Sequence, residues 1–102
     1  MNFDERLLPV SLMIKIVFTK YITPILNEQF IKFESKNDIE SYKLTILGVI
    51  NNSGIDMVLS SLSKKYIESI EKDYFSTKGL RDFIYQQLLT SSFEFAKPYL
   101  QK

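Results

Sequence analysis

Apolar residues recur at three- and four-residue steps along most of this chain, which is the spacing of one face of an α-helix. Between residues 12 and 30 the apolar face is so wide that little of the helix is polar, so we expect this first helix to be mostly buried. Pro24 lies inside the pattern, where it removes a backbone donor and crowds the preceding turn, and it predicts a kink or a close break. Asn37 and Asp38 then provide a cap for a second helix that runs to Ile50.

The run Asn51-Asn52-Ser53-Gly54 is the strongest break in the sequence, because it combines residues that tolerate a left-handed conformation with a final glycine. We expect the second helix to stop there. From Ile55 to Tyr74 an apolar stripe lies opposite a polar one, which predicts an amphipathic, half-exposed helix, and a partner helix follows from Leu80 to Leu88. The aromatic tail, residues 91–102, has enough apolar surface to pack against the rest.

The stretch from Lys20 to Phe30 recurs, in degraded form, from Lys65 to Phe75. In both copies a helix, a phenylalanine, a polar connection and a second helix follow in the same order. Two amphipathic helices of similar composition can also match by chance, so it is this order that favours a duplication. In the second copy Ser69 replaces Pro24 without interrupting the periodicity, so the first helix should keep its course through the proline.

These patterns predict an all-α single domain, a small helical bundle of two repeated αα motifs related by a pseudo-two-fold axis. Motif 1 covers about residues 11–51, motif 2 covers about residues 55–90, and residues 91–102 form a docked C-terminal helical segment. Each motif is apolar on one side and cannot bury that side alone, so the two should pack together. The first helix is apolar on so many sides that a homodimer competes with the binding of another protein.

A groove should run between the two motifs where equivalent helices diverge, and an aromatic groove suits a peptide or a partner helix. Its expected lining consists of aromatic residues that exceed the needs of a small core: Phe18, Phe30, Phe33, Tyr74, Phe75, Phe83 and Tyr85. For each of them plain core packing is the alternative. We therefore expect a non-enzymatic protein-interaction module whose partner is a protein or a peptide.

The chain has no cysteine and no histidine, which removes thiolate nucleophiles, zinc–thiolate sites, the commonest general base and the commonest metal ligand. No catalytic residue, metal or cofactor is therefore expected. Glu28 and Asp73 occupy equivalent positions in the two copies, so a pseudo-two-fold axis could pair their carboxylates. Two solvated helix faces are the plainer interpretation of these acids.

The chain carries 13 basic and 12 acidic residues, and this near balance argues against a large nucleic-acid footprint. Nucleic-acid binding is still the alternative function, because two helices around Asn51–Gly54 outline a helix-turn-helix. The second of them would begin with Ile55–Leu59, which is too apolar and acidic to reach base edges. The apolar window from Leu7 to Leu26 is interrupted by Lys15 and Lys20, so no membrane span is expected.

In overall character, and in stretches such as Leu12-Met13-Ile14-Lys15-Ile16-Val17-Phe18, the chain resembles the small orphan proteins of filamentous viruses of thermophilic archaea. It is also similar in size and helicity to bacteriocin immunity proteins. The viral resemblance implies a protein of the host cytoplasm without a transferable site. The acidic N-terminus differs from the basic start of a secretory signal and likewise favours an intracellular protein.

Overall fold

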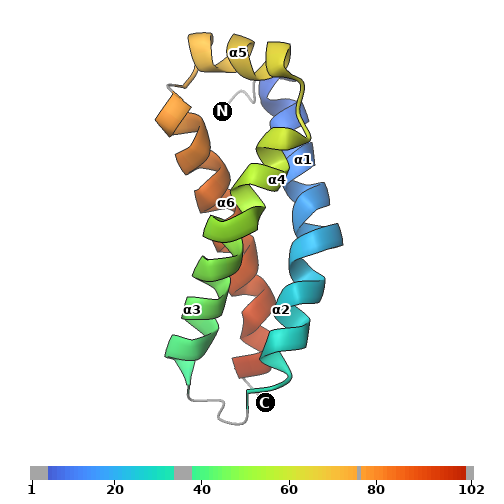
Figure 1. Ribbon diagram of the computed structural model, residues 1–102, viewed down its shortest axis with the longest axis vertical. Helices are drawn as coiled ribbons and strands as arrows, with labels where there is room; N and C mark the ends of the chain where they lie inside the picture. Colours follow the sequence, from blue (N-terminus) through green and yellow to red (C-terminus); the bar gives the residue numbers. More distant parts are fainter. Residues whose placement is uncertain (1–4, 34–37, 76, 101–102) are drawn as a thin grey trace.

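The computed structural model describes residues 5–33, 38–75 and 77–100 of the 102-residue chain. Every element within these ranges is helical. Two long rods and a third long helix pack together, and a short helix lies across one end of them (Figure 1). The protein is therefore an all-α bundle, as the hydrophobic pattern predicts.

The first rod joins η1 (Glu5–Leu7), α1 (Leu8–Val17), η2 (Phe18–Ile22) and α2 (Thr23–Phe30) without a break. Its middle element, η2, is a π turn, in which the backbone hydrogen bonds span five residues instead of four. The first helix thus runs as far as the apolar pattern predicts.

Pro24 explains this π turn, because a proline cannot donate to the chain behind it and its ring crowds the preceding carbonyls. The N–H of Thr23 bonds the carbonyl of Phe18, five residues back. The Thr23 hydroxyl donates to the carbonyl of Thr19 at 2.8 Å, so that acceptor is satisfied without an N–H from Pro24. The wider turn admits the proline, and the prediction that the first helix continues through Pro24 is confirmed.

The second rod joins α3 (Ile39–Val49), η3 (Ile50–Gly54) and α4 (Ile55–Ser60). Asp38 caps its first turn, as predicted, because its carboxylate accepts the N–H of Ser41 at 3.1 Å. The Ser41 hydroxyl bonds the same carboxylate. These hydrogen bonds lower the pKa of Asp38, with the hydroxyl contributing most.

The predicted helix stop at Asn51–Gly54 is wrong, because a second π turn carries the rod through these residues. Gly54 is buried where the two rods cross α6 (Thr77–Leu100). A Cβ at this position would lie 3.2 Å from Cδ1 of both Ile22 and Leu88. The glycine therefore allows helices to approach closely and does not end one.

The predicted single helix from Ile55 to Tyr74 is also wrong, because the chain leaves the helix at residues 61–63 and turns across the end of the bundle (Figure 1). Helix α5 (Lys64–Asp73) begins there. Ser63 caps it, since the Ser63 hydroxyl accepts the N–H of Tyr66 at 3.1 Å. The polar run Ser60-Ser61-Leu62-Ser63 is the signal that could have predicted this turn.

Helix α6 unites the predicted partner helix and the predicted C-terminal segment, because it continues without a break to Leu100. Pro98 falls in its last turn. The predicted docking of the tail is confirmed for residues 91–100: Ala96 is fully buried, and Phe95 and Tyr99 pack against the core. This part of the chain is the end of a long helix and not a separate segment.

The structure does not confirm the predicted duplication. Residues 12–30 form one uninterrupted rod, whereas the matching residues 57–75 leave the helix at 61–63 and change direction. Two copies of one motif would share a backbone path. The sequence match between Lys20–Phe30 and Lys65–Phe75 therefore does not extend to the fold.

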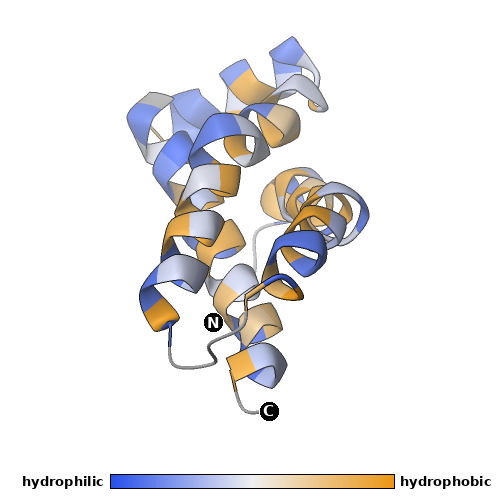
Figure 2. Cartoon of the chain, turned by 60° about the horizontal axis from the view of Figure 1, so that its bottom comes forward, coloured by the Kyte–Doolittle hydropathy of each residue, from blue (hydrophilic) through white to orange (hydrophobic). Residues whose placement is uncertain are grey.

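The core changes character along the bundle, in which apolar and polar positions alternate along the helices (Figure 2). Where α2, α3 and α6 meet it is aromatic: the ring of Phe30 lies 4.6 Å from that of Tyr42 and 5.2 Å from that of Tyr99. Near α5 the core is aliphatic. The buried residues there are Val10, Ile14, Val58, Ile70, Leu80 and Ile84.

Candidate functional site

The aromatic residues predicted to line one groove lie in separate parts of the bundle. Phe18, Phe30 and Phe33 belong to the aromatic end, where Phe18 packs edge-on against Phe95 at 6.3 Å and Phe33 lies 4.9 Å from Tyr42. Phe30 is fully buried at the centre of this cluster. For Phe30 the alternative of plain core packing is therefore the correct one.

The other predicted lining residues lie toward the α5 end. Phe75 contacts Tyr74 and Phe83, with ring centroids 6.4 and 5.4 Å apart. Tyr85 lies apart from both groups, beside a shallow hollow that it shares with Arg81 and other residues of the η3–α6 contact. The structure thus gathers the predicted set into two clusters and one isolated tyrosine, and not along one groove.

A groove does exist between α2 and α3, with a volume of about 360 Å³. Ile25 on α2 is 40% exposed and Leu44 on α3 is 61% exposed, although both are large apolar side chains. The remaining lining residues are small or polar apart from Val49, which is a further apolar side chain: Gln29, Thr45, Gly48, Val49, Asn52 and Ser53. The groove thus has two apolar walls and a floor of small side chains.

The floor of this α2–α3 groove is open because of Gly48. A Cβ built at Gly48 would meet no atom within 4 Å. The Thr45 hydroxyl donates to the carbonyl of Ser41 at 2.8 Å, and the Ser53 hydroxyl donates to the carbonyl of Val49 at 3.0 Å. These donors are engaged by their own helix, so the floor presents mainly carbon atoms to an occupant.

A second hollow, of about 420 Å³, lies at the aromatic end between α2 and the last turns of α6. Its walls are Ile31, Phe95 and Pro98, and the Tyr99 hydroxyl donates a hydrogen bond to the Asn27 side chain across it. That hydrogen bond ties the two helices together. The hollow therefore has one engaged polar pair and otherwise apolar walls.

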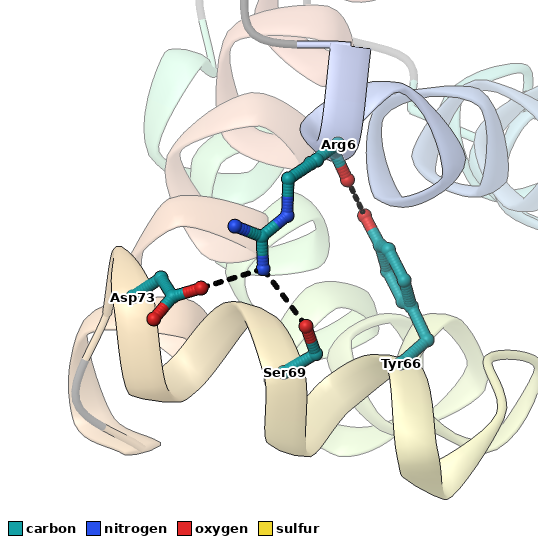
Figure 3. A network of polar contacts seen from close by, with 4 residues as sticks. All are labelled: Arg6, Tyr66, Ser69 and Asp73. Atoms are coloured by element: carbon teal, nitrogen blue, oxygen red, sulfur yellow. Dashed lines mark hydrogen bonds and ion pairs between the residues drawn. The ribbon is translucent and has the colours of Figure 1, made fainter.

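A network of polar contacts holds α5 to the start of the first rod (Figure 3). The Arg6 guanidinium lies 2.7 Å from the Asp73 carboxylate and donates to the Ser69 hydroxyl at 2.8 Å. It also lies over the ring of Tyr74, 5.2 Å from the centroid. These contacts join residues more than 60 positions apart, so no local pattern in the sequence indicates them.

Tyr66 is the second anchor of α5. Its hydroxyl donates to the carbonyl of Arg6 at 2.6 Å and accepts the N–H of Val10 at 3.3 Å. Burial raises the pKa of Tyr66, while the hydrogen bond from Val10 and the positive charge of Arg6 act in the opposite direction. The phenol therefore stays protonated and serves as a structural donor.

The possible pairing of Glu28 with Asp73 is wrong. Glu28 lies on α2 beside Lys32 at 3.8 Å, whereas Asp73 lies at the end of α5 and binds Arg6. Among the described residues no group of three or more acids could hold a metal ion. The structure thus keeps Glu28 and Asp73 apart and offers no chelating cluster of three acids within the part of the chain that it covers.

The helix-turn-helix outline is wrong as well, because Asn51–Gly54 is part of a continuous rod and not a turn. By length and composition alone, the helix Glu5–Phe30 could cross a membrane. A core helix passes the same test, and this rod buries Val10, Ile14 and Val17 against its neighbours. Only 22% of its apolar window is buried, because the neighbouring helices cover one side of the rod, so the prediction that the first helix is mostly buried is wrong. The expected lack of a membrane span therefore stays a prediction.

Comparisons of the chain with protein-family models, with curated proteins and with solved structures found no match. The resemblance to archaeal viral proteins and the cytoplasmic location that it implies therefore stay predictions.

Proposed function

We propose that this protein is a non-enzymatic interaction module that binds a peptide or protein segment in the α2–α3 groove. The observation that carries this proposal is the pair of exposed apolar walls, Ile25 and Leu44, on either side of the open floor at Gly48. Leaving such large apolar side chains in water forfeits their burial energy. Because Ile25 and Leu44 face the same groove, a bound segment that covers both would recover this burial energy.

The groove suits an amphipathic helix better than an extended peptide. An extended peptide is commonly bound by pairing with the edge of a sheet, and the described residues contain no strand. A helix docks by placing one or two large apolar side chains between two walls. A volume of about 360 Å³ lies within the usual range for ligand pockets and can take such an anchor.

Gly48 also favours this function, because a glycine inside a helix costs about 1 kcal/mol relative to alanine. Gly54 in the same rod is explained by the crossing of helices, whereas no atom of the described residues lies within 4 Å of a Cβ built at Gly48. A bound segment would account for that space.

The proposal is tested by selecting peptides from a displayed library of amphipathic helices against the purified protein. A Cβ at position 48 has open space around it and leucine favours the helix, so Gly48→Leu should fold and fill the groove floor. We expect peptides selected on the natural protein to bind this variant about tenfold or more weakly, a change of about 1.4 kcal/mol. Titration calorimetry or fluorescence anisotropy measures the affinity.

Thr90→Leu is the matched control, because it adds the same side chain at an exposed position of α6 outside the groove. It should leave peptide affinity unchanged. Equal binding to both leucine variants would place the peptide elsewhere, and a library without any apolar binder would overturn the proposal.

A further inference from the structure

The outer face of α1 carries an apolar stripe that the bundle does not cover. Leu8, Leu12 and Ile16 are 45, 50 and 48% exposed and follow one another at four-residue steps. They lie on the other side of the helix from Val10 and Ile14, which are buried. The stripe is separate from the α2–α3 groove and is not needed for the proposed peptide site.

Beside this stripe lies a hollow of about 440 Å³ lined by Lys15, Ile16, Thr19 and Lys20. All four residues come from the first rod, where α1 passes into the π turn. The lysine stems, Thr19 and Ile16 line a shallow hollow that an apolar side chain from outside could cover. The face thus has an exposed leucine at Leu8 and a shallow apolar hollow that begins two helical turns later.

We propose that the outer face of α1 binds a second copy of this chain in antiparallel orientation. Leu8 of each copy enters the hollow around Ile16 of the other, and Leu12 lies next to the two-fold axis. A single face then supplies both halves of the contact, as an isologous dimer requires. The separation of Leu8 from Ile16, roughly 12 Å at 1.5 Å per residue, sets the register.

The charged residues on the outer face of α1 favour the antiparallel arrangement over a parallel one. In this register Glu5 of one copy comes opposite Thr19 and next to Lys20 of the other, within reach of its long side chain, and the symmetry gives two such pairs of opposite charge. A parallel arrangement would instead set Lys15 against Lys15 and Lys20 against Lys20, which is repulsive. Glu5 and Lys20 are both exposed in the single chain, so each is available for such a contact.

The expected dimer is weak. An interface confined to one face of one helix is smaller than the standard interface of about 1,600 Å². We therefore expect the chain to pass from monomer to dimer as its concentration rises, and sedimentation equilibrium measures this change. Leu12→Ser should shift the midpoint to higher concentration by about tenfold or more. Ile39→Ser, a matched change at an exposed position of α3 outside the α2–α3 groove, should leave the midpoint where it is.

The absence of cysteine from the chain allows the register to be tested by single cysteines. In oxidised glutathione the Leu12→Cys variant should form a disulfide-linked dimer many times faster than either the Leu8→Cys or the Ile16→Cys variant alone. A mixture of the last two variants should cross-link with each other. Equal self-linking at all three positions would indicate a parallel or non-specific contact and would overturn the proposal.

Charge reversal provides a second test. Glu5→Lys and Lys20→Glu should each weaken the dimer severalfold, and the doubly reversed chain should recover the affinity. If the doubly reversed chain did not recover the dimer affinity, the pairing of Glu5 with Lys20 would be disproved.

Vesicles of phosphatidylcholine with phosphatidylglycerol distinguish a lipid surface from a second copy. A chain that stays monomeric at every concentration, yet binds these vesicles through Leu12, would overturn the proposal in favour of lipid. Peptide binding in the α2–α3 groove is measured separately, so either proposal can fail alone.

Discussion

The two ends of the bundle are held by different forces. At the aromatic end, α2, α3 and α6 meet around Phe30, whose ring is fully buried among other rings. At the opposite end, α5 is held by one fully buried side chain, Ile70, by the partly buried Ile67 and the ring of Tyr66, and by the polar contacts of Arg6 and Tyr66. One end is closed by packing, and the other is closed by a short helix laid across it.

This difference indicates where the protein opens first. The side chains of Arg6 and Asp73 are 46 and 45% exposed, and ion pairs as exposed as this one contribute about 0–1 kcal/mol. Buried aromatic packing contributes several times more. We therefore expect α5 to detach in local openings that leave the aromatic end intact.

The largest effect should come from Phe30→Ala. The loss of a fully buried ring should lower the free energy of unfolding by about 3–5 kcal/mol and abolish the two-state transition if the bundle is only marginally stable. Denaturant unfolding followed by circular dichroism measures the change. Phe93→Ala removes the same ring from an exposed position and should cost far less. Equal losses of stability in Phe30→Ala and Phe93→Ala would contradict the larger contribution of the buried aromatic end.

Gly54 lies between the two ends, and Gly54→Val should weaken both together. The added side chain would push into Ile22 and Leu88, which are fully buried, at a cost of about 1–3 kcal/mol. Gly48→Ala is the matched change in open space and should stabilise the protein by up to about 1 kcal/mol. Thermal melts of the two variants should shift in opposite directions, and a shift of both in one direction would contradict the crossing geometry.

Tyr66→Phe should loosen α5 alone. The change leaves the carbonyl of Arg6 and the N–H of Val10 without their side-chain partner, which costs about 0.5–1.5 kcal/mol. Amide hydrogen exchange should accelerate in α5 and remain unchanged around Phe30. Tyr21→Phe, at an exposed tyrosine of the first rod, should leave exchange in α5 unaffected. Faster exchange at both ends would show that the two ends open together.

The smallest effect concerns the cap of α3. Because hydrogen bonds from Ser41 hold the pKa of Asp38 below its usual value of about 3.9, the carboxylate form stabilises the folded chain above that pH. This contribution is lost as the pH falls through the lowered pKa of the folded state. Asp38→Asn keeps a capping oxygen but cannot titrate, so its melting temperature should depend less on pH below about 4. If the melting temperatures of Asp38→Asn and of the natural protein depended on pH in the same way, the Asp38 cap would not be the cause of the pH dependence.

The sequence predicted those features that depend on neighbouring residues. The periodic apolar pattern gave the all-α class, and Asp38 was identified as a cap because a helical pattern follows it directly. The continuation through Pro24 was also predicted, although the π turn that makes it possible was not. The Ser60–Ser63 run could have predicted the start of α5, but the stronger signal at Gly54 misplaced the boundary.

The sequence did not locate the α2–α3 groove that we propose as a binding surface. Aromatic residues were expected to line a groove between repeated motifs, whereas most of them pack in two clusters, and the groove that exists is lined by Ile25, Leu44 and Gly48. Aromatic residues are the best core formers, so a surplus of them indicates burial as well as binding. Exposure alone identifies the groove, and exposure is not encoded in any local pattern.

By itself, the sequence determined that this chain is helical, where its apolar faces lie and which chemistry its missing cysteine and histidine remove. Only the tertiary structure decided that Gly54 is a crossing point, that α5 closes one end through Arg6 and Tyr66, and which apolar residues remain in water. The physical reason is that helix formation depends on residues three or four positions apart, whereas a crossing, a cap across a bundle or an uncovered stripe depends on residues brought together from distant parts of the chain.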